Sequence, residues 1–205
     1  MTYHQVGREI SNIRIVVEDV GTVEAHVADQ LPNIFSMAAY DGLDVLGHRY
    51  ASEIAHIRHA RDFISRTIKD PKNIVVTSRN FQDDVTGFAI ARATSQDAFS
   101  LVAIGVHPDL RYTPLREDMP HPQIGAQLYH RIVKSISGQG GSRLDIITPS
   151  ATEFFTKVGA CCEATLDAEK YRFEDLQPYP EEIRKGLKIA RYRHNIAAFR
   201  GQAVA

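Results

Sequence analysis

Apolar residues along the chain recur at spacings that distinguish strands from helices. β-Branched residues dominate Ile10–Glu18, which predicts a first strand. Apolar residues then recur every three or four positions in Thr22–Met37, where Pro32 ends or kinks the helix, and again in Ser52–Ile68. We therefore expect a helix in each segment, with a loop between them at Tyr40–Tyr50.

Three strands are predicted in quick order after the second helix. They are Asn73–Ser78, Val85–Ala93 and Phe99–Val106, and polar turns connect them. Connections this short are typical of an antiparallel meander. A one-face apolar stripe, with Ile124 and Ile136 at its two ends, then predicts a long helix.

The last third of the chain is predicted to contain shorter elements. We expect strands at Arg143–Thr148, Ala160–Leu166 and Tyr171–Leu176, with a short helix after the first of them. Thr148 or Ser150 would cap this short helix, and the sequence leaves both open. The charged segment Glu181–Phe199 is predicted to be a closing helix.

This order of elements predicts an α/β or α+β fold with a mixed, mostly antiparallel sheet flanked by helices. The second half contains a strand, a helix and a parallel strand, a crossover that must be right-handed. A chain of 205 residues fits one large domain. We therefore expect one domain over residues 1–178 and a helical extension over residues 179–205 that packs on or beside it.

The composition is ordinary for a globular protein. Hydrophobic residues make up 43% of the chain, charged residues make up 24%, and the formal net charge is -1. This balance gives no whole-chain argument for nucleic acid or membrane binding. The sequence has no apolar stretch near the ~18 residues of a spanning helix, and its first residues lack the order of a signal peptide. We therefore expect a cytoplasmic protein that does not bind a membrane.

The spacing of cysteine and histidine predicts neither a disulfide nor a metal site. Cys161 and Cys162 are adjacent, so a bond between them would strain the backbone, and two thiols are too few for structural zinc. We expect them to be small apolar fillers on opposite faces of a strand. His56 and His59 lie three residues apart on a predicted helix, but no third ligand lies near them in the sequence.

Motifs on either side of the long predicted helix carry a resemblance to a known family. A strand ends in Val106-His107-Pro108, a turn follows at Gln123–Ala126, and "ATEFFTKVGA" lies after the next strand. This run, over about residues 73–167, resembles the GNAT superfamily of acyl-CoA N-acyltransferases. The resemblance implies that the strand with Ile104 and Val106 splays from Leu144–Thr148 and leaves a central V-shaped gap.

The turn before the long helix has a physical reason to bind phosphate. A helix start exposes backbone N–H groups and the positive end of the helix dipole, so a pyrophosphate fits there. By resemblance, Gln123 replaces the first glycine of the family's turn and Gly125 matches its second small residue. The alternative is an ordinary helix start in which Gly125 permits close packing on the strand. An upstream Gln or Arg of the family corresponds to Arg111 if residues 112–121 are an insertion, and falls on Pro120 otherwise.

The resemblance also implies how the cofactor would be held. Backbone groups near Ile104 and Val106 would bind the pantetheine arm and polarise the thioester carbonyl, although plain strand pairing is the alternative for both. Thr148 would hydrogen-bond the same arm. The implied cofactor contacts are Ile104, Val106, Arg111, Gln123, Ile124, Gly125, Ala126, Gln127, Thr148 and Phe155.

The sequence assigns no catalytic acid or base. An amine must lose a proton before it attacks a thioester, and the departing thiolate gains from a proton donor. Phe155 stands where the family often has a tyrosine donor, and Phe99–Val106 contains no carboxylate or histidine. His107 is a poor candidate for the base, because it lies at the very end of that strand. The loop residues Asp41, Asp44, His48 and Tyr50 are either substrate contacts or part of a solvated loop.

The resemblance implies an N-acyltransferase that moves an acetyl group from acetyl-CoA to a primary amine by direct attack in a ternary complex. The rival hypothesis, motivated by Phe155 and Gln123, is a GNAT-fold protein that has lost transfer and binds acyl-CoA or a partner. No metal is expected. The acceptor and the oligomeric state are not fixed, and a homodimer stays open. RNA binding by the basic C-terminal helix is the less favoured interpretation of its charge.

Overall fold

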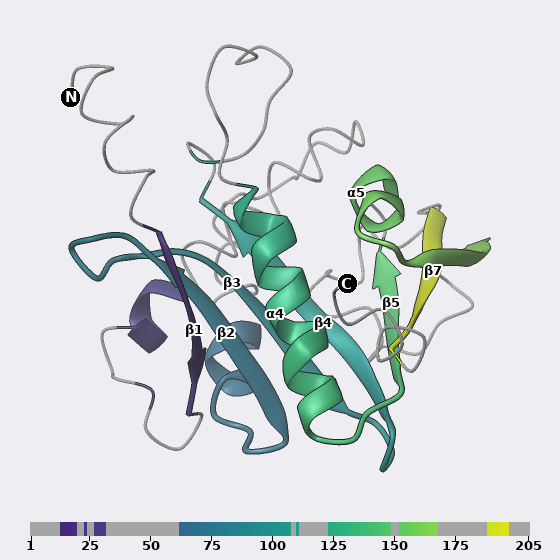
Figure 1. The fold of residues 1–205 in the computed structure, drawn as a ribbon, viewed down its shortest axis with the longest axis horizontal. Helices are drawn as coiled ribbons and strands as arrows, with labels where there is room; N and C mark the ends of the chain where they lie inside the picture. Colours follow the sequence, from purple (N-terminus) through teal and green to yellow (C-terminus); the bar gives the residue numbers. More distant parts are fainter. Residues whose placement is uncertain are drawn as a thin grey trace, which may run out of the picture.

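The computed structural model describes residues 13–19, 23, 27–31, 62–107, 110, 123–148, 152–167 and 188–196. The strands of this part form one sheet and are β1 (Arg14–Glu18), β2 (Asn73–Arg79), β3 (Val85–Ala93), β4 (Ala98–Val106), β5 (Arg143–Thr148), β6 (Cys161–Asp167) and β7 (Lys188–Asn195). Their order across the sheet is β1-β2-β3-β4-β5-β7-β6 (Figure 1). Within the described part, only β4 and β5 are parallel neighbours, so the predicted mixed, mostly antiparallel sheet is confirmed.

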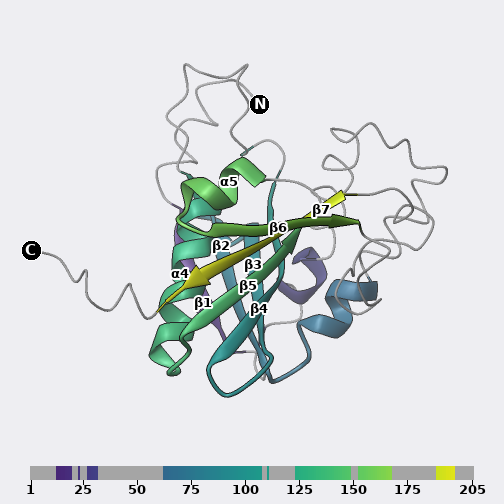
Figure 2. The ribbon, with the colours of Figure 1, turned by 90° about the vertical axis from the view of Figure 1, so that its right-hand side faces the viewer.

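Helices lie on both faces of this sheet. α4 (Ile124–Gly138) crosses one face, and the helical residues 27–31 and 62–67 lie on the other (Figure 2). α5 (Thr152–Lys157) is on the same side as α4, because Phe155 belongs to the buried cluster under α4. The predicted apolar stripe is confirmed, since α4 buries Ile124, Leu128, Ile132 and Ile136.

Two buried clusters hold these layers together. The cluster under α4 draws residues from β2, β3, β4, β5 and β7. The second cluster, which contains Leu31, Ile64 and Phe88, draws its strand residues from β2, β3 and β4. Burying a side chain of this size contributes about 1.5–3 kcal/mol. Among the described residues, the second cluster therefore covers only the half of the sheet that precedes β5.

The helix predicted over Glu181–Phe199 is wrong where the structure describes this segment. Lys188–Asn195 is β7, which lies between β5 and β6 and pairs antiparallel with both. The buried residues Ala190, Tyr192 and His194 alternate with half-buried arginines. This two-residue period is that of a strand, and the high charge of the segment concealed it.

The other predicted strands agree closely with the structure. β3 and β5 begin and end at the predicted residues, β2 and β4 differ from the prediction by one residue at one end, and β6 is shifted by one residue at both ends. The part of the first strand that is described begins at Arg14. No helix in the described residues is long and apolar enough to cross a membrane.

Cys161 and Cys162 begin β6 with both thiols free and exposed. They register with Arg193 and Tyr192, which point to opposite faces of β7, so their placement on opposite faces is confirmed. Their predicted role as apolar fillers is wrong, because β6 is the last strand of the sheet and leaves both side chains open to solvent.

Several predictions fall outside the described residues. These are the helix boundaries before residue 62, the loop at Tyr40–Tyr50 with Asp41, Asp44 and His48, the pair His56 and His59, Arg111, residues 112–121, Ser150, the strand at Tyr171–Leu176 and the domain boundary at residue 178.

Candidate active site

The candidate site is a fork between β4 and β5. The parallel ladder joins only Ala98–Leu101 to Arg143–Ile146. Beyond it, the remaining residues of the two strands, Val102–Val106 and Ile147–Thr148, do not pair with each other. We call these two strand ends the fork. The predicted V-shaped splay is therefore confirmed.

An extra residue in β4 explains where the fork opens. Along the β3–β4 ladder, Ile90 faces Ala103 while Ala91 faces Leu101, so Val102 is left over. A β-bulge of this kind bends its strand and increases the local twist. Val102 directly follows the last β4 residue that pairs with β5, and the bend therefore turns the rest of β4 away from β5.

The main-chain polar groups of Ile104 and Val106 point toward the β5 side of β4. The His107 N–H donates to the Thr86 carbonyl oxygen at 2.8 Å, so these two residues form a hydrogen-bonded pair between β4 and β3. Bonded and non-bonded pairs alternate along an antiparallel ladder, which makes the pairs of Ile104 and Val106 with β3 non-bonded ones. Their N–H and C=O groups therefore face the fork.

α4 begins beside the fork with a residue in an uncommon conformation. The N-cap residue Gln123 has φ 46° and ψ 41°, in the left-handed region. A non-glycine residue in this region costs about 1–2 kcal/mol, and glycine is the usual occupant. Gln123 thus holds a backbone conformation that glycine adopts more readily, as expected if it stands in the place of a glycine.

The first turn of α4 leaves backbone N–H groups available for a ligand. The first helical bond runs from the Gln127 N–H to the Gln123 carbonyl at 3.0 Å, and the side chain of the N-cap residue Gln123 makes no capping hydrogen bond. Within the described part of the chain, the N–H groups of Ile124, Gly125 and Ala126 have no acceptor. A left-handed residue followed by helical ones forms a nest that binds anions, and the helix dipole adds positive potential. This donor set fits a phosphate group.

Gly125 is the point at which α4 meets both α5 and the fork. A Cβ atom on Gly125 would lie 3.3 Å from Cε2 of Phe154 in α5 and 3.8 Å from Cγ2 of Val106 in β4. A side chain at this position would therefore press on the ring of Phe154 before it met the strand. The same contacts place the anion-binding turn next to the open end of β4.

Phe155 lies in the hydrophobic core beneath α5. Its side chain is 2% exposed, and its ring centroid lies 6.1 Å from that of Tyr129, 5.1 Å from that of Phe154 and 5.8 Å from that of Tyr192. A phenylalanine has no hydroxyl group and cannot donate a proton. Its contact with a cofactor stays a prediction.

A buried polar pair beside α5 was missed by the sequence analysis. Tyr129 Oη and His194 Nδ1 lie 3.1 Å apart and share a hydrogen bond, and both side chains are buried. Burial raises the pKa of Tyr129, while burial and then the charge of His130 lower the pKa of His194, so both stay neutral near pH 7. His194 registers with Leu144 in the ladder, not with the fork. Each side chain of the pair therefore provides a hydrogen-bond partner for the other in the core. The alternation of buried and more exposed residues along β7 is the sequence signal that could have predicted a buried His194.

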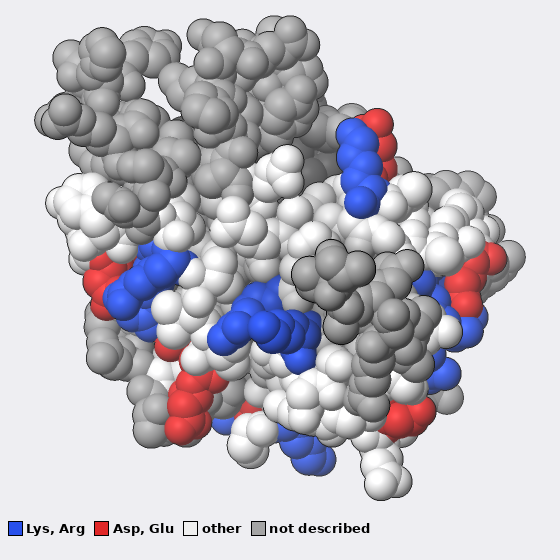
Figure 3. Space-filling view, viewed as in Figure 1, with Lys and Arg blue, Asp and Glu red and all other residues white. Residues whose placement is uncertain are grey.

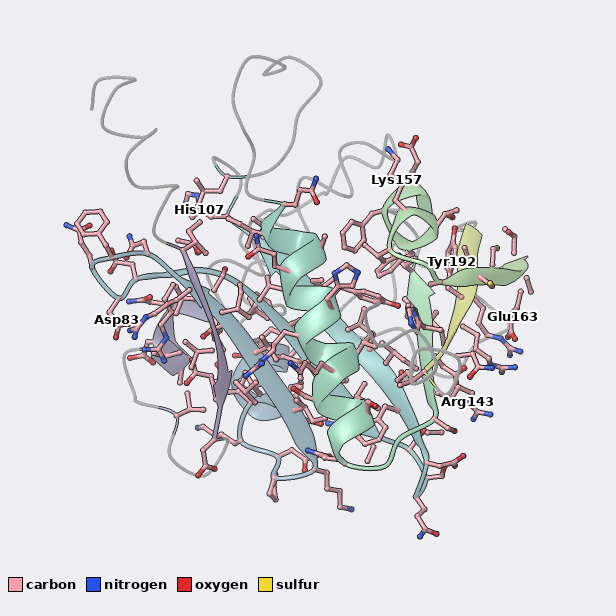
Figure 4. All side chains as sticks on the ribbon, in the orientation of Figure 1. Asp83, His107, Arg143, Lys157, Glu163 and Tyr192 are labelled. Atoms are coloured by element: carbon pink, nitrogen blue, oxygen red, sulfur yellow. The ribbon has the colours of Figure 1, made fainter. Side chains whose placement is uncertain are left out.

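The remaining predicted site residues that the structure describes lie around the fork. Thr148, 9% exposed, ends β5 and registers with Ala190. Ile104 and Val106 are partly buried against the cluster under α4. His107 lies at the same end of the sheet as the start of α4 (Figure 4). No three His, Cys, Asp or Glu side chains of the described ranges come together as metal ligands.

Solved structures of the same fold are acetyltransferases. Aminoglycoside 6'-acetyltransferase type Ii matches with a TM-score of 0.61 at 15% identity, over 89% of this chain and 97% of that chain. Aminoglycoside 6'-N-acetyltransferase complexed with coenzyme A matches with a TM-score of 0.57 at 16% identity, over 89% of this chain and 97% of that chain. A GNAT family acetyltransferase from Elizabethkingia anophelis with acetyl-CoA bound matches with a TM-score of 0.55 at 12% identity, over 90% of this chain and 98% of that chain.

The chain therefore has the fold of the GNAT superfamily, as the motifs predict. The sequence matches no protein-family model and no curated protein at a significant level.

Proposed function

We propose that the protein is an N-acyltransferase that moves an acetyl group from acetyl-CoA to a primary amine by direct attack in a ternary complex. The observation that carries the proposal is a helix start with exposed N–H donors, next to a fork of strands. The structures of this fold that hold coenzyme A or acetyl-CoA support the choice of co-substrate.

The start of α4 would hold the pyrophosphate of acetyl-CoA. The N–H groups of Ile124, Gly125 and Ala126 would donate to its oxygens, and the positive end of the helix dipole favours the negative charge. Gln127 lies in the same turn, after Ala126. Gly125 would keep the backbone free of a side chain at the closest point of approach.

The fork would hold the pantetheine arm and the thioester. The main-chain groups of Ile104 and Val106 face this space, and the Thr148 hydroxyl lies at the end of the opposite strand. An N–H that donates to the thioester oxygen favours the negative charge that develops there during attack. Donors of this kind, held in place beforehand, are worth about 2.7–4 kcal/mol in other enzymes.

Proton transfer is the least specified part of the proposal. The fork residues on β4, Val102–Val106, carry no carboxylate or imidazole, and Phe155 in α5 cannot protonate the thiolate. The amine would therefore give its proton to water or to a side chain from the loop at Tyr40–Tyr50, whose Asp41, Asp44 and His48 remain predictions.

Binding of acyl-CoA without transfer is a second candidate function. The burial of Phe155 favours it, because the residue that replaces the family's tyrosine is part of the core and supplies no proton. On this alternative, the turn and the fork would bind acyl-CoA as a signal and not as a substrate.

Release of free thiol from acetyl-CoA distinguishes the two functions. We expect thiol release and a product heavier by one acetyl group when the protein is mixed with acetyl-CoA and a panel of small amines, peptides and aminoacyl-tRNA. Binding of acetyl-CoA by calorimetry, with no thiol release across the whole panel, would favour the second function. Absence of binding would contradict both.

A further inference from the structure

Five charged side chains form a continuous chain of ion pairs across β5, β7 and β6, which we call the ion chain. Arg143 Nε lies 3.1 Å from Asp145 Oδ2, and Arg193 Nε lies 3.0 Å from Asp145 Oδ1. Arg193 Nη1 lies 2.6 Å from Glu163 Oε1, and Arg191 Nη2 lies 3.1 Å from Glu163 Oε2. Basic and acidic side chains accordingly lie next to one another at the right-hand edge of the molecule (Figures 3 and 4).

The order of charges along the ion chain leaves cations at both ends. Each oxygen of Asp145 and of Glu163 faces a guanidinium, so both negative charges are balanced within the ion chain. The side chains of the two end residues, Arg143 and Arg191, are 45% and 43% exposed. Three arginines against two carboxylates give the ion chain an excess of positive charge.

Arg191 is the end of the ion chain whose backbone is level with the fork along β5. It registers with Ile147, the first β5 residue beyond the ladder with β4. Its neighbours in β7, Ala190 and Tyr192, are buried on the α4 side, so Arg191 points to the opposite face of the sheet. Arg191 gives Nε and Nη2 to Glu163, and within the described part of the chain Nη1 has no partner. Its guanidinium, held beside β6 by Glu163, can therefore bind an anion on the face of the sheet opposite α4.

The opposite end of the ion chain provides an internal comparison. Arg143 registers with Ala98, at the closed end of the ladder, and also with Asn195 in β7. It holds a carboxylate by one nitrogen and is as exposed as Arg191. The two arginines lie on different strands, and only Arg191 registers with a β5 residue beyond the ladder with β4.

We propose that Arg191 binds an anionic group of the acceptor, so that the acceptor is an amine that also carries a carboxylate or a phosphate. This inference rests on the proposed function. If the pyrophosphate is bound on the α4 side, the thioester lies in the fork, and the amine approaches from the other face, where Arg191 lies. Glu163 positions the guanidinium and leaves its outer N–H groups to the acceptor.

The test compares acceptors that differ only in the anionic group. β-Alanine is compared with β-alaninamide, phosphoethanolamine with ethanolamine, and spermidine serves as a polycation. Because a hydrogen bond to a charged group is worth about tenfold or more, we expect kcat/KM to be at least about tenfold higher for the anionic member of at least one pair. The pair that shows the preference tells a carboxylate from a phosphate.

Two matched variants then assign this preference to one end of the ion chain. Arg191→Gln should lower the anionic-to-neutral ratio of kcat/KM about tenfold, Arg191→Lys should restore part of it, and Arg143→Gln should leave it unchanged. An equal loss in Arg143→Gln, equal rates for both members of each pair, or a preference for spermidine would overturn the inference. Turnover of the neutral amines in those cases would leave the proposed function intact, whereas no turnover of any amine would contradict the proposed function itself.

Discussion

The first four strands of the sheet and the last three are covered in different ways. β2 is buried along its whole length and β3 from Val85 to Ala91, with α4 on one face and the cluster around Phe88 on the other. β5 alternates buried and more exposed residues, and its outer face continues into the ion chain of β7 and β6. The first half is thus a packed scaffold, while the second half keeps one charged face.

Among the described residues, strand pairing joins the two halves at one end only, where β4 meets β5. Beside the short parallel ladder, the Ser142 N–H donates to the Asp97 carbonyl at 2.7 Å and the Ile196 N–H donates to the Ser142 carbonyl at 2.8 Å. These contacts form a joint at the closed end of β4 and β5. The comparison of the halves indicates two causes of the fork. The joint holds β4 and β5 together at one end, and the bulge at Val102 bends β4 away from β5 toward the other end.

The largest effect is expected from filling space at the joint. A Cβ atom on Gly141 would overlap Cγ2 of Ile136 and lie 2.8 Å from Cε2 of Phe99, and both side chains are buried. Gly141→Ala should therefore lower the free energy of unfolding by about 2–3 kcal/mol, measured by urea denaturation. Gly138→Ala is the control, because a Cβ at Gly138 meets nothing within 4 Å. Equal stability of the two variants would contradict a tightly packed joint.

A smaller loss is expected where α4 contacts the second half. Tyr129→Phe removes the hydroxyl that shares a hydrogen bond with buried His194. An unsatisfied buried group costs about 1–3 kcal/mol, so we expect a loss of unfolding free energy in this range. Ser135→Ala, which removes an exposed 2.9 Å bond to the Arg131 carbonyl on the same helix, should cost less than Tyr129→Phe. The reverse order would show that the pair does not link the halves.

The same pair predicts a pH dependence of stability. Burial, and then the charge of His130, lower the pKa of His194 in the folded state, so the unfolded state binds more protons. The contribution is fully present above the ordinary histidine pKa of 6.5 and is lost as the pH falls toward the lowered folded value. Unfolding free energies at several pH values should therefore decline below pH 6.5 more steeply in the native protein than in His194→Gln. Parallel curves would contradict a buried neutral His194.

The smallest change in unfolding free energy is expected from breaking an ion pair at the surface of α5. Lys157 Nζ lies 3.4 Å from Glu153 Oε1, but the two side chains are 71% and 85% exposed (Figure 4). Lys157→Ala should change the free energy of unfolding by no more than about 0.5 kcal/mol. Glu163→Gln, which weakens two links of the ion chain, should cost more. If Lys157→Ala lost more unfolding free energy than Glu163→Gln, the ion chain would not stabilise the second half more than an exposed ion pair does.

The spacing of apolar residues predicted most of the fold, because the side chains that a strand or helix buries set that spacing. β3 and β5 were predicted to the residue, since their apolar residues lie between polar turns. β7 was missed because the charged residues in and around it concealed the alternation of Ala190, Tyr192 and His194, and a strand between two others can hold charges on one face. The charge of the segment therefore favoured a helix in the prediction, whereas its pairing with β5 and β6 makes it a strand.

The motifs predicted the position of the candidate site and the splay of its two strands, but not the local backbone features that shape it. The left-handed conformation of Gln123 and the bulge at Val102 have no periodic signal, because both arise from how strands and helix are joined. The ion chain depends on the strand order β5-β7-β6, which brings together residues far apart in the sequence, such as Asp145 and Arg193.

Binding of acetyl-CoA tests the central claim most directly. Calorimetry with acetyl-CoA should detect binding to the native protein, and Gly125→Val should weaken it at least about tenfold, because the added methyl groups meet Phe154 and crowd the N–H groups of the turn. Gly138→Val, at the other end of α4, should bind like the native protein, and circular dichroism should show both variants folded. No binding to the native protein at millimolar concentration, or equal affinity of all three proteins, would contradict the account.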